Sequence, residues 1–260
     1  MLRVASAVIS RYGSTMRLWL GLMMLLASAT SGSASTGGCP RITMDLPPLP
    51  GLRAEIAANM PVTIVALGSS STEGAGATGP EGAYPARLEA LLRRALPGHE
   101  IQVINAGRSG ETANEMLARL ERDVLAQRPD LVIWQAGANE ALKGSDPGAF
   151  SHQMEEGLSR LREAGIATVL MDNQRSPRIF QTPGSGRFPE LLRKLAQERR
   201  VAIFSRSRLM TGWAEAGLPA AEVLSPDGLH HNDRGYACLA EALANSLLQA
   251  AGVGTLVAGR

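Results

Sequence analysis

The stretch VTIVALGSSSTEG, residues 62–74, decides the fold, because an apolar run passes directly into a loop of serines and glycines. A short, continuous apolar run rich in β-branched residues and closed by a turn signal is typical of a fully buried strand in a parallel sheet. The polar loop then lies at the carboxyl end of that strand, where open α/β sheets bind their ligands.

The same pattern recurs along the chain. Four further apolar runs predict strands: IQVINA (101–106), LVIWQA (131–136), ATVLMD (167–172) and VAIF (201–204). Three apolar stripes of helical period lie among and after them: Leu88, Leu91, Leu92 and Ala95; Met116, Leu117, Leu120 and Val124; and Tyr236, Leu239, Ala240, Leu243 and Leu247. This alternation predicts one α/β domain, a three-layer α/β/α fold with a parallel sheet of about five strands and helices on both faces.

The N-terminal 34 residues are typical of a secretory signal peptide. They contain three arginines and no acid, then the apolar core LWLGLMMLLA (18–27), and they end in small residues at Ala34. The core is shorter than the roughly 20 apolar residues that span a bilayer. We expect cleavage, a lead-in over 35–60, no stable membrane span afterwards, and a secreted or periplasmic protein. A retained N-terminal anchor is the alternative.

The charge balance argues against a nucleic-acid partner. The chain has 26 basic and 24 acidic side chains, but three of the basic ones lie in residues 1–34. The remainder carries 23 basic against 24 acidic side chains, a net charge of −1. Without an overall basic excess, composition gives no support for a phosphate-binding surface.

Two cysteines leave three alternatives open. Cys39 follows the expected cleavage site, and Cys238 lies near the C-terminus. In an oxidising compartment they could form a disulfide, and otherwise they are two free thiols. The sequence TGGC ending at Cys39 is also a weak match to a lipid-attachment box, which makes a lipid anchor the less favoured reading.

The glycines of the first loop also fit a dinucleotide-binding pattern, GAGATG at residues 74–79. That fingerprint needs its first glycine directly after the strand and an acid at the end of the next strand. Here six residues separate Leu67 from Gly74, and Glu100 precedes the second strand. A phosphate-binding P-loop would need a lysine that this loop lacks. The loop is therefore better read as the position of a nucleophile.

A serine hydroxyl is a poor nucleophile until a base takes its proton. The segment SPDGLHHND, residues 225–233, offers such a base, because Asp227 and His230 are three residues apart. In a tight turn this spacing lets the carboxylate accept from one imidazole nitrogen while the other faces outward. A metal site is the alternative for this segment, but no further His or Cys cluster is available, so we expect no metal here.

Two more loops at strand ends carry groups that can stabilise an oxyanion. Gly110 lies in NAGRSGET, residues 105–112, and Asn139 lies in GANE, residues 137–140. The backbone N–H groups of Ser70 and Gly110, with the Asn139 amide, form a plausible set of donors. Taken singly, Gly110 also fits a turn glycine and Asn139 a helix cap.

Together these four segments resemble the conserved blocks of the SGNH, or GDSL, hydrolases. GSSSTEG (68–74) is similar to the first block, G-D-S-x-T-x-G; NAGRSGET to the second; GANE to the third, G-x-N-D; and DGLHHND (227–233) to the last, D-x-x-H. The blocks appear in the family's order and cover most of the chain after residue 34. The resemblance implies a flavodoxin-like SGNH hydrolase domain over 61–252.

Carried over by position, the resemblance implies that Ser70 is the nucleophile, His230 the base and Asp227 its orienting partner. It also implies that Ser70, Gly110 and Asn139 form the oxyanion hole. The expected activity is hydrolysis of acetyl or short-acyl esters of a small molecule or a glycan, without a cofactor. A thioesterase or lysophospholipase, an O-acyltransferase, and a non-catalytic envelope-binding module on this fold are the alternatives.

Three positions depart from the pattern or have no role in it. Ser69 stands where the first block usually has Asp, and Glu140 stands where the third block usually has Asp. His231 follows the expected base directly. We expect activity to survive these departures, because the nucleophile and the donors are present, and the roles of Glu140 and His231 stay open.

Overall fold

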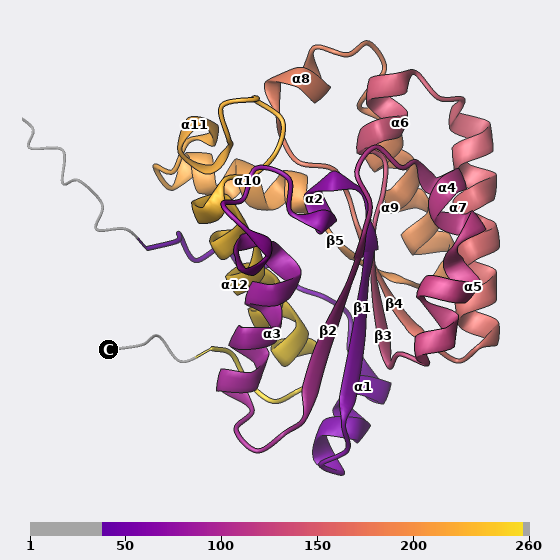
Figure 1. Ribbon diagram of the computed structural model, residues 1–260, viewed down its shortest axis with the longest axis vertical. Helices are drawn as coiled ribbons and strands as arrows, with labels where there is room; N and C mark the ends of the chain where they lie inside the picture. Colours follow the sequence, from indigo (N-terminus) through magenta and orange to yellow (C-terminus); the bar gives the residue numbers. More distant parts are fainter. Residues whose placement is uncertain (1–37, 257–260) are drawn as a thin grey trace, which may run out of the picture. The chain divides into compact units, whose positions relative to one another are not determined.

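A computed structural model describes residues 38–256, which fold around a five-stranded parallel sheet in the order β2-β1-β3-β4-β5 (Figure 1). The strands are β1 (Val62–Gly68), β2 (Ile101–Gly107), β3 (Leu131–Gln135), β4 (Ala167–Met171) and β5 (Ala202–Phe204). Each lies at the predicted apolar run, with ends that differ by one residue, so the predicted α/β fold is confirmed. The expected signal peptide, residues 1–34, lies outside the described residues.

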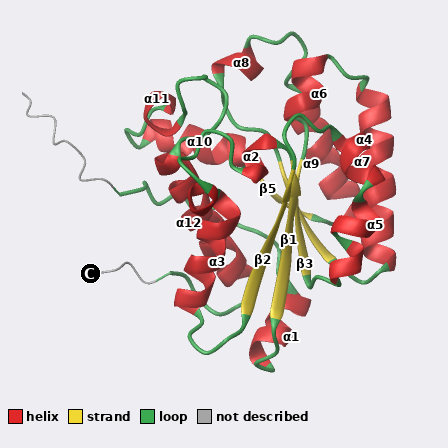
Figure 2. Ribbon diagram, in the orientation of Figure 1, coloured by secondary structure: helices red, strands yellow, loops and turns green. Residues whose placement is uncertain are grey.

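Helices cover both faces of the sheet, which makes three layers (Figure 2). One face carries α1 (Pro50–Ala57), α3 (Tyr84–Ala95), α10 (Arg206–Glu215) and α12 (Asp233–Ala250). The other carries α4 (Ala113–Ala118), α5 (Leu120–Asp123), α7 (Pro147–Glu163) and α9 (Arg187–Arg199). Short segments complete the chain: α2 (Ser70–Glu73), α6 (Ala138–Lys143), α8 (Pro177–Phe180), α11 (Ala220–Val223), and the 3₁₀ turns η1 (Pro80–Gly82) and η2 (Leu125–Gln127).

The inner strands β1, β3 and β4 are mostly apolar because both of their faces are buried, whereas the edge strand β2 exposes Gln102 and Asn105. In β1, Ile64 points into the core beneath α3 and α12, while Val65 and Leu67 point into the core beneath α4, α7 and α9. Trp134 of β3 fills the second core against α7, where Gly157 leaves room for it, since a Cβ there would lie 2.3 Å from the ring. Period-two burial therefore separates two hydrophobic cores across one sheet.

The lead-in before β1 takes part in this packing. Met44 and Leu49 are buried in the same core as Leu52 and Ile56 of α1. A proline at the start of α1 suits its first turn, where the missing N–H would have no partner in the helix. Residues 44–56 therefore belong to the folded body, although the Pro-rich sequence gave no sign of a helix there.

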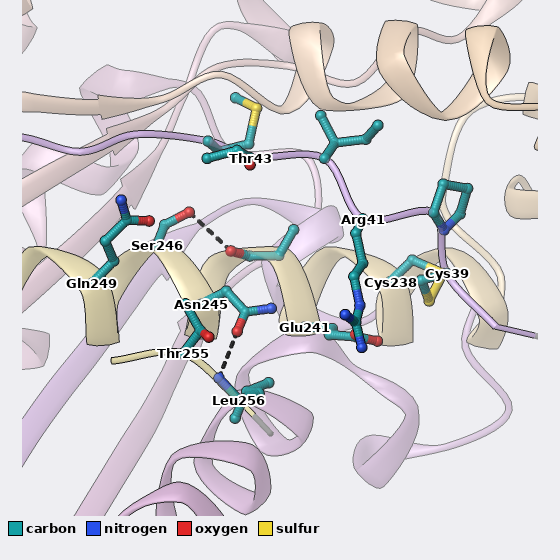
Figure 3. A pocket seen from close by; sticks show the side chains of 14 residues that line it. Cys39, Arg41, Thr43, Cys238, Glu241, Asn245, Ser246, Gln249, Thr255 and Leu256 are labelled. Carbon is teal, nitrogen blue, oxygen red and sulfur yellow. Dashed lines mark hydrogen bonds between the residues drawn. A yellow bond between two sulfur atoms is a disulfide. The ribbon is translucent and has the colours of Figure 1, made fainter. Parts of the chain in front are cut away.

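Cys39 and Cys238 form a disulfide that joins the lead-in to α12 across 199 residues of sequence. The bond borders a pocket of about 160 Å³ lined by polar side chains of α12, among them Glu241, Asn245 and Gln249 (Figure 3). Asn245 accepts a hydrogen bond from the amide of Leu256 at 2.7 Å, so the pocket also fixes the segment after α12. None of Ser70, Asp227 or His230 lines it.

The second predicted helical stripe is divided between two helices. Met116 and Leu117 lie in α4 and Leu120 in α5, and Arg119 between them leaves the helical conformation with φ −109° and ψ 5°. Arg119 is 5% exposed, and its guanidinium donates to the carbonyl oxygens of Gly68 at 3.2 Å and Ala106 at 2.8 Å. The break between α4 and α5 therefore places the buried guanidinium of Arg119 at the ends of β1 and β2.

None of the helices in the described part of the chain combines the length and the apolar character that crossing a bilayer requires.

Candidate active site

Ser70, His230 and Asp227 form a continuous hydrogen-bonded chain at the carboxyl edge of the sheet. His230 Nε2 lies 2.8 Å from Ser70 Oγ, and His230 Nδ1 lies 2.5 Å from Asp227 Oδ2. A carboxylate oxygen can only accept here, so Nδ1 carries the proton and donates it to Asp227. Nε2 is then free to accept the proton of the Ser70 hydroxyl.

The turn that carries Asp227 and His230 is held by Asp227 itself. Its Oδ1 accepts from Ser225 Oγ at 2.6 Å, from the Leu229 amide at 2.8 Å and from the His230 amide at 3.0 Å. Partial burial works against the charge, but the hydrogen bonds from Ser225, His230 and the two amides outweigh it and hold the pKa of Asp227 below its usual range. Asp227 is therefore a charged, fixed acceptor at neutral pH.

Ser70 is the first residue of α2, which follows β1 directly. The turn packs so closely on the neighbouring strand that Gly107 has no room for a side chain, since a Cβ there would lie 2.1 Å from the amide nitrogen of Glu73. Gly68 and Gly107 are partners in the β1–β2 register, so the ends of the two strands lie level. Because Gly107 has no side chain, the loop of the second block can lie beside Ser70.

Gly110 has φ +80°, a left-handed conformation that favours glycine. Its carbonyl accepts from Lys143 Nζ at 2.7 Å, and the next carbonyl, of Glu111, accepts from Asn139 Nδ2 at 2.7 Å. Both donors belong to α6, which therefore fixes the direction of the 110–111 backbone. Within the described residues, the amides of Ser70 and Gly110 donate to no backbone or side-chain acceptor.

Asn139 is the second residue of α6, so it is not the N-cap of that helix. An amide side chain carries two N–H groups. One of those of Asn139 binds Glu111, which leaves the other available to a ligand.

Glu140 joins the second and third blocks. Its carboxylate is 1% exposed and accepts from the Gly137 amide at 3.0 Å and from the Ala113 amide. Burial raises the pKa of Glu140, and the hydrogen bonds from the amides of Ala113, Glu140 and Gly137 oppose that shift. The longer acid at this position thus reaches across to the start of α4 and ties two loops of the site together.

His231 points away from Ser70 and into the core beneath α12. It is fully buried, its Nδ1 lies 3.1 Å from the carbonyl of Val223, and its ring meets Trp213 and Tyr236 edge to face. Burial, reinforced by the charge of Arg206, lowers the pKa of His231 to about 3. His231 is therefore a neutral core residue, and only His230 of the pair faces Ser70.

Two buried residues of this region have contacts in the site that the sequence did not predict. Gln135, at the end of β3, accepts hydrogen bonds from Ser69 and Thr72, on either side of Ser70. Arg119 binds the last carbonyls near the ends of β1 and β2 and forms ion pairs with Glu111 at 2.7 Å and Asp123 at 3.0 Å. From the sequence, Gln135 is one more residue of a strand and Arg119 is typical of a helix surface. Only the tertiary structure reveals their contacts.

A groove for long acyl chains would need apolar side chains on one surface, and four apolar residues of this half of the chain are Trp134, Met171, Ile179 and Phe180. The first three are at most 2% exposed and belong to the core, while Phe180 is 56% exposed beneath the guanidinium of Arg175. They do not share one surface. In the described part of the chain, no group of three or more His, Cys, Asp or Glu side chains is arranged to hold a metal ion.

Comparison with known proteins identifies the family. Residues 39–253 match the model of the non-GDSL lipase-like family. An arylesterase of Vibrio mimicus is 31% identical over 170 residues, which is 65% of this chain and 80% of that relative. An acetylxylan esterase of Geobacillus stearothermophilus is 38% identical over 85 residues, which is 32% of this chain and 39% of that relative.

Among solved structures, a two-domain esterase (CEX) active on acetylated mannans has a TM-score of 0.68 at 24% identity. The match covers 80% of this chain and 55% of that one, so this chain spans about half the length of the two-domain esterase. The family's name agrees with the first block, in which Ser69 stands where the GDSL pattern has Asp. With its sheet order and the 39–253 match, the chain belongs to the non-GDSL lipase-like family, with the SGNH-type fold.

Proposed function

We propose that this ester hydrolase works through a Ser70 acyl-enzyme, with His230 as the base and Asp227 as its orienting partner. The observation that carries the proposal is the chain from Asp227 Oδ2 through His230 to Ser70 Oγ, with links of 2.5 and 2.8 Å. A donor on one imidazole nitrogen and an acceptor on the other is the arrangement that activates a serine hydroxyl.

The steps follow from these positions. Ser70 Oγ attacks the acyl carbonyl as His230 Nε2 takes its proton, and the carbonyl oxygen becomes an oxyanion. The free amides of Ser70 and Gly110 and the second N–H of Asn139 supply three donors for that oxyanion. His230 then protonates the leaving alcohol, and the acyl-enzyme forms.

Deacylation repeats these steps with water as the nucleophile. His230 removes a proton from the water as it attacks the acyl-enzyme, and it returns that proton to Ser70 as the acid leaves. Asp227, charged and fixed by its turn, stabilises the imidazolium in both halves of the cycle. The proposed cycle uses these side chains, the two backbone amides and water.

The proposed substrates are acetyl or short-acyl esters, with a carbohydrate as the alcohol. Support comes from the names of the similar proteins, an arylesterase, an acetylxylan esterase and an esterase active on acetylated mannans. Trp134, Met171 and Ile179 are buried, so these three side chains offer no surface to a long acyl chain. A panel of p-nitrophenyl esters of increasing acyl length, with acetylated sugars, tests this: activity should be highest for acetyl and fall with length.

Replacement of the nucleophile is the direct test of the site. Ser70→Ala should abolish turnover of p-nitrophenyl acetate and labelling by a fluorophosphonate, while the unfolding midpoint stays within a few degrees of wild type. Ser71→Ala is the matched control, because Ser71 is buried next to Ser70 and forms no part of the hydrogen-bonded chain. Full activity in Ser70→Ala would remove Ser70 from the mechanism.

The alternatives use the same assay. An O-acyltransferase would give an acetylated sugar instead of acetate when a carbohydrate acceptor is added, and a thioesterase would hydrolyse added acyl thioesters faster than the matching oxygen esters. A non-catalytic envelope-binding module would not react with a fluorophosphonate. Labelling of wild type, acetate as the product and faster hydrolysis of oxygen esters than of thioesters together separate the proposed esterase from all three.

We also propose that residues 1–34 are a signal peptide and that the folded protein is secreted or periplasmic. The disulfide suits an oxidising compartment. The same sulfur atom cannot carry both a disulfide and a thioether, so this bond is incompatible with a lipid anchor at Cys39. Mass spectrometry of the exported protein should give an N-terminus just after Ala34, and an intact residue 1 would contradict the proposal.

A further inference from the structure

Gln135 lies beneath the turn that carries Ser70 and contacts it on both sides. Its Oε1 accepts from the Ser69 amide at 3.0 Å, from Ser69 Oγ at 3.1 Å and from Thr72 Oγ1 at 3.3 Å. All three residues are buried: Gln135 and Thr72 have no exposed surface, and Ser69 is 2% exposed. One oxygen atom at the end of β3 therefore holds the residue before Ser70 and the residue two positions after it.

The orientation of this amide follows from its neighbours. The N–H of Ser69 can only donate, so the atom of Gln135 that faces it must be the oxygen. The hydroxyl groups of Ser69 and Thr72 then donate to the same oxygen. Thr72 Oγ1 is also 3.4 Å from the hydroxyl of Tyr84, which can donate to it in turn. The turn is thus linked through Thr72 to α3.

Gly68, at the end of β1, leaves room for these contacts because it has no side chain. A Cβ on Gly68 would lie 2.1 Å from Thr72 Oγ1 and 2.9 Å from Gln135 Oε1. The arrangement also explains Ser69. An aspartate there would place a carboxylate against the Gln135 oxygen, whereas a serine supplies a hydroxyl that donates to it.

We propose that Gln135 is a positioning residue that fixes the Ser70 turn through its carbonyl oxygen, so that Ser70 Oγ meets His230 and the Ser70 amide meets the oxyanion. This rests on the proposed function, because it concerns the same nucleophile. Gln135 forms no hydrogen bond with Ser70 or His230, and it acts through Ser69 and Thr72. Replacing Gln135 should therefore change the rate at which Ser70 attacks, and leave substrate binding unchanged.

The test compares two replacements of similar length. Gln135→Met removes the acceptor, whereas Gln135→Glu keeps a carboxyl oxygen at the same place. The rate of Ser70 labelling by a fluorophosphonate measures the reactivity of the nucleophile, and p-nitrophenyl acetate gives kcat and KM. Gln135→Met should lower the labelling rate and kcat by roughly 10- to 100-fold, the range expected for a misplaced reacting group, with KM within about twofold. Gln135→Glu should recover most of the labelling rate.

The controls distinguish failure of the positioning role of Gln135 from failure of the proposed serine mechanism. If wild type is not labelled at all, the proposed serine mechanism fails. If wild type is labelled and Gln135→Met is labelled equally fast, or if the Met and Glu variants lose the same activity, the positioning role is overturned. Gln153→Met, on α7 and outside the site, is the matched control and should behave as wild type.

A gentler variant covers the case in which Gln135→Met does not fold. Thr72→Val removes one of the three hydrogen bonds and keeps the branched shape of the side chain. Its labelling rate should fall severalfold with KM unchanged. A wild-type rate in folded Thr72→Val would count against the proposal.

Discussion

Asn139 has two contacts to make in this site. One N–H holds the Glu111 carbonyl at 2.7 Å, and the other is the proposed donor to the oxyanion. We predict that Asn139→Ala lowers kcat roughly 100-fold or more, as loss of one oxyanion donor does elsewhere. Steady-state kinetics with p-nitrophenyl acetate measures it. Asn114→Ala, on the exposed side of α4, is the matched control, and an unchanged kcat in Asn139→Ala would exclude it from the site.

His231 links the stability of the protein to pH. In the unfolded chain its pKa is near 6.5, whereas burial lowers it to about 3 in the folded protein. Above pH 6.5 both states are neutral at this residue, and its full contribution to stability is present. Below 6.5 the unfolded state binds a proton that the folded state takes up only near pH 3, so stability falls with pH across this interval, by up to about 1.4 kcal/mol per pH unit.

The prediction is that His231→Asn flattens this dependence. Urea unfolding between pH 7 and pH 4 should show a smaller loss of unfolding free energy in the variant than in wild type, whatever its stability at pH 7. His152→Asn removes an exposed imidazole and should leave the slope unchanged. Parallel curves for wild type and His231→Asn would show that His231 is not the linked group.

At the scale of elements, the strands and the order of the loops could be predicted from the sequence. Apolar runs such as residues 62–67 are long enough and branched enough to mark buried strands, and the polar blocks follow their ends directly. Because parallel strands end at one edge, this alone predicted that Ser70, Gly110 and Asn139 would gather. The spacing of Asp227 and His230 predicted a contact between their side chains, and in the structure it measures 2.5 Å.

Other features depend on contacts that no local pattern encodes. The break between α4 and α5 occurs because Arg119 binds carbonyls of β1 and β2, which are distant in sequence. Gln135 occupies an inward strand position where an apolar residue would fit the pattern equally well. Helix α1 is short, and besides its first-turn proline it depends on the burial of Leu52 and Ile56 in the core.

The whole molecule is tied by one covalent link, from Cys39 to Cys238. A bond that closes a loop of 199 residues restricts the unfolded chain strongly, and the chain-entropy model gives about 5 kcal/mol, at the upper end of what disulfides contribute. We predict that Cys39→Ser with Cys238→Ser lowers the free energy of unfolding by about 2–5 kcal/mol. Urea unfolding with and without a reductant measures the effect.

The double variant should retain the wild-type kcat/KM in the absence of denaturant, because the disulfide and its pocket contain none of Ser70, Asp227 or His230. It should also be insensitive to the reductant. If reduction opens the bond in wild type, as a thiol titration would show, and the unfolding curve does not move, the disulfide has no part in stability.

The separation of Ser70 and His230 by 160 residues has a consequence for timing. In the proposed mechanism the nucleophile Ser70 emerges early in synthesis and its base His230 only near the end, so a growing or unfolded chain holds the serine without its partner. The proposed hydrolysis requires the loop that carries His230 to lie beside Ser70. In this mechanism, activity reports that the first and last parts of the domain have folded together.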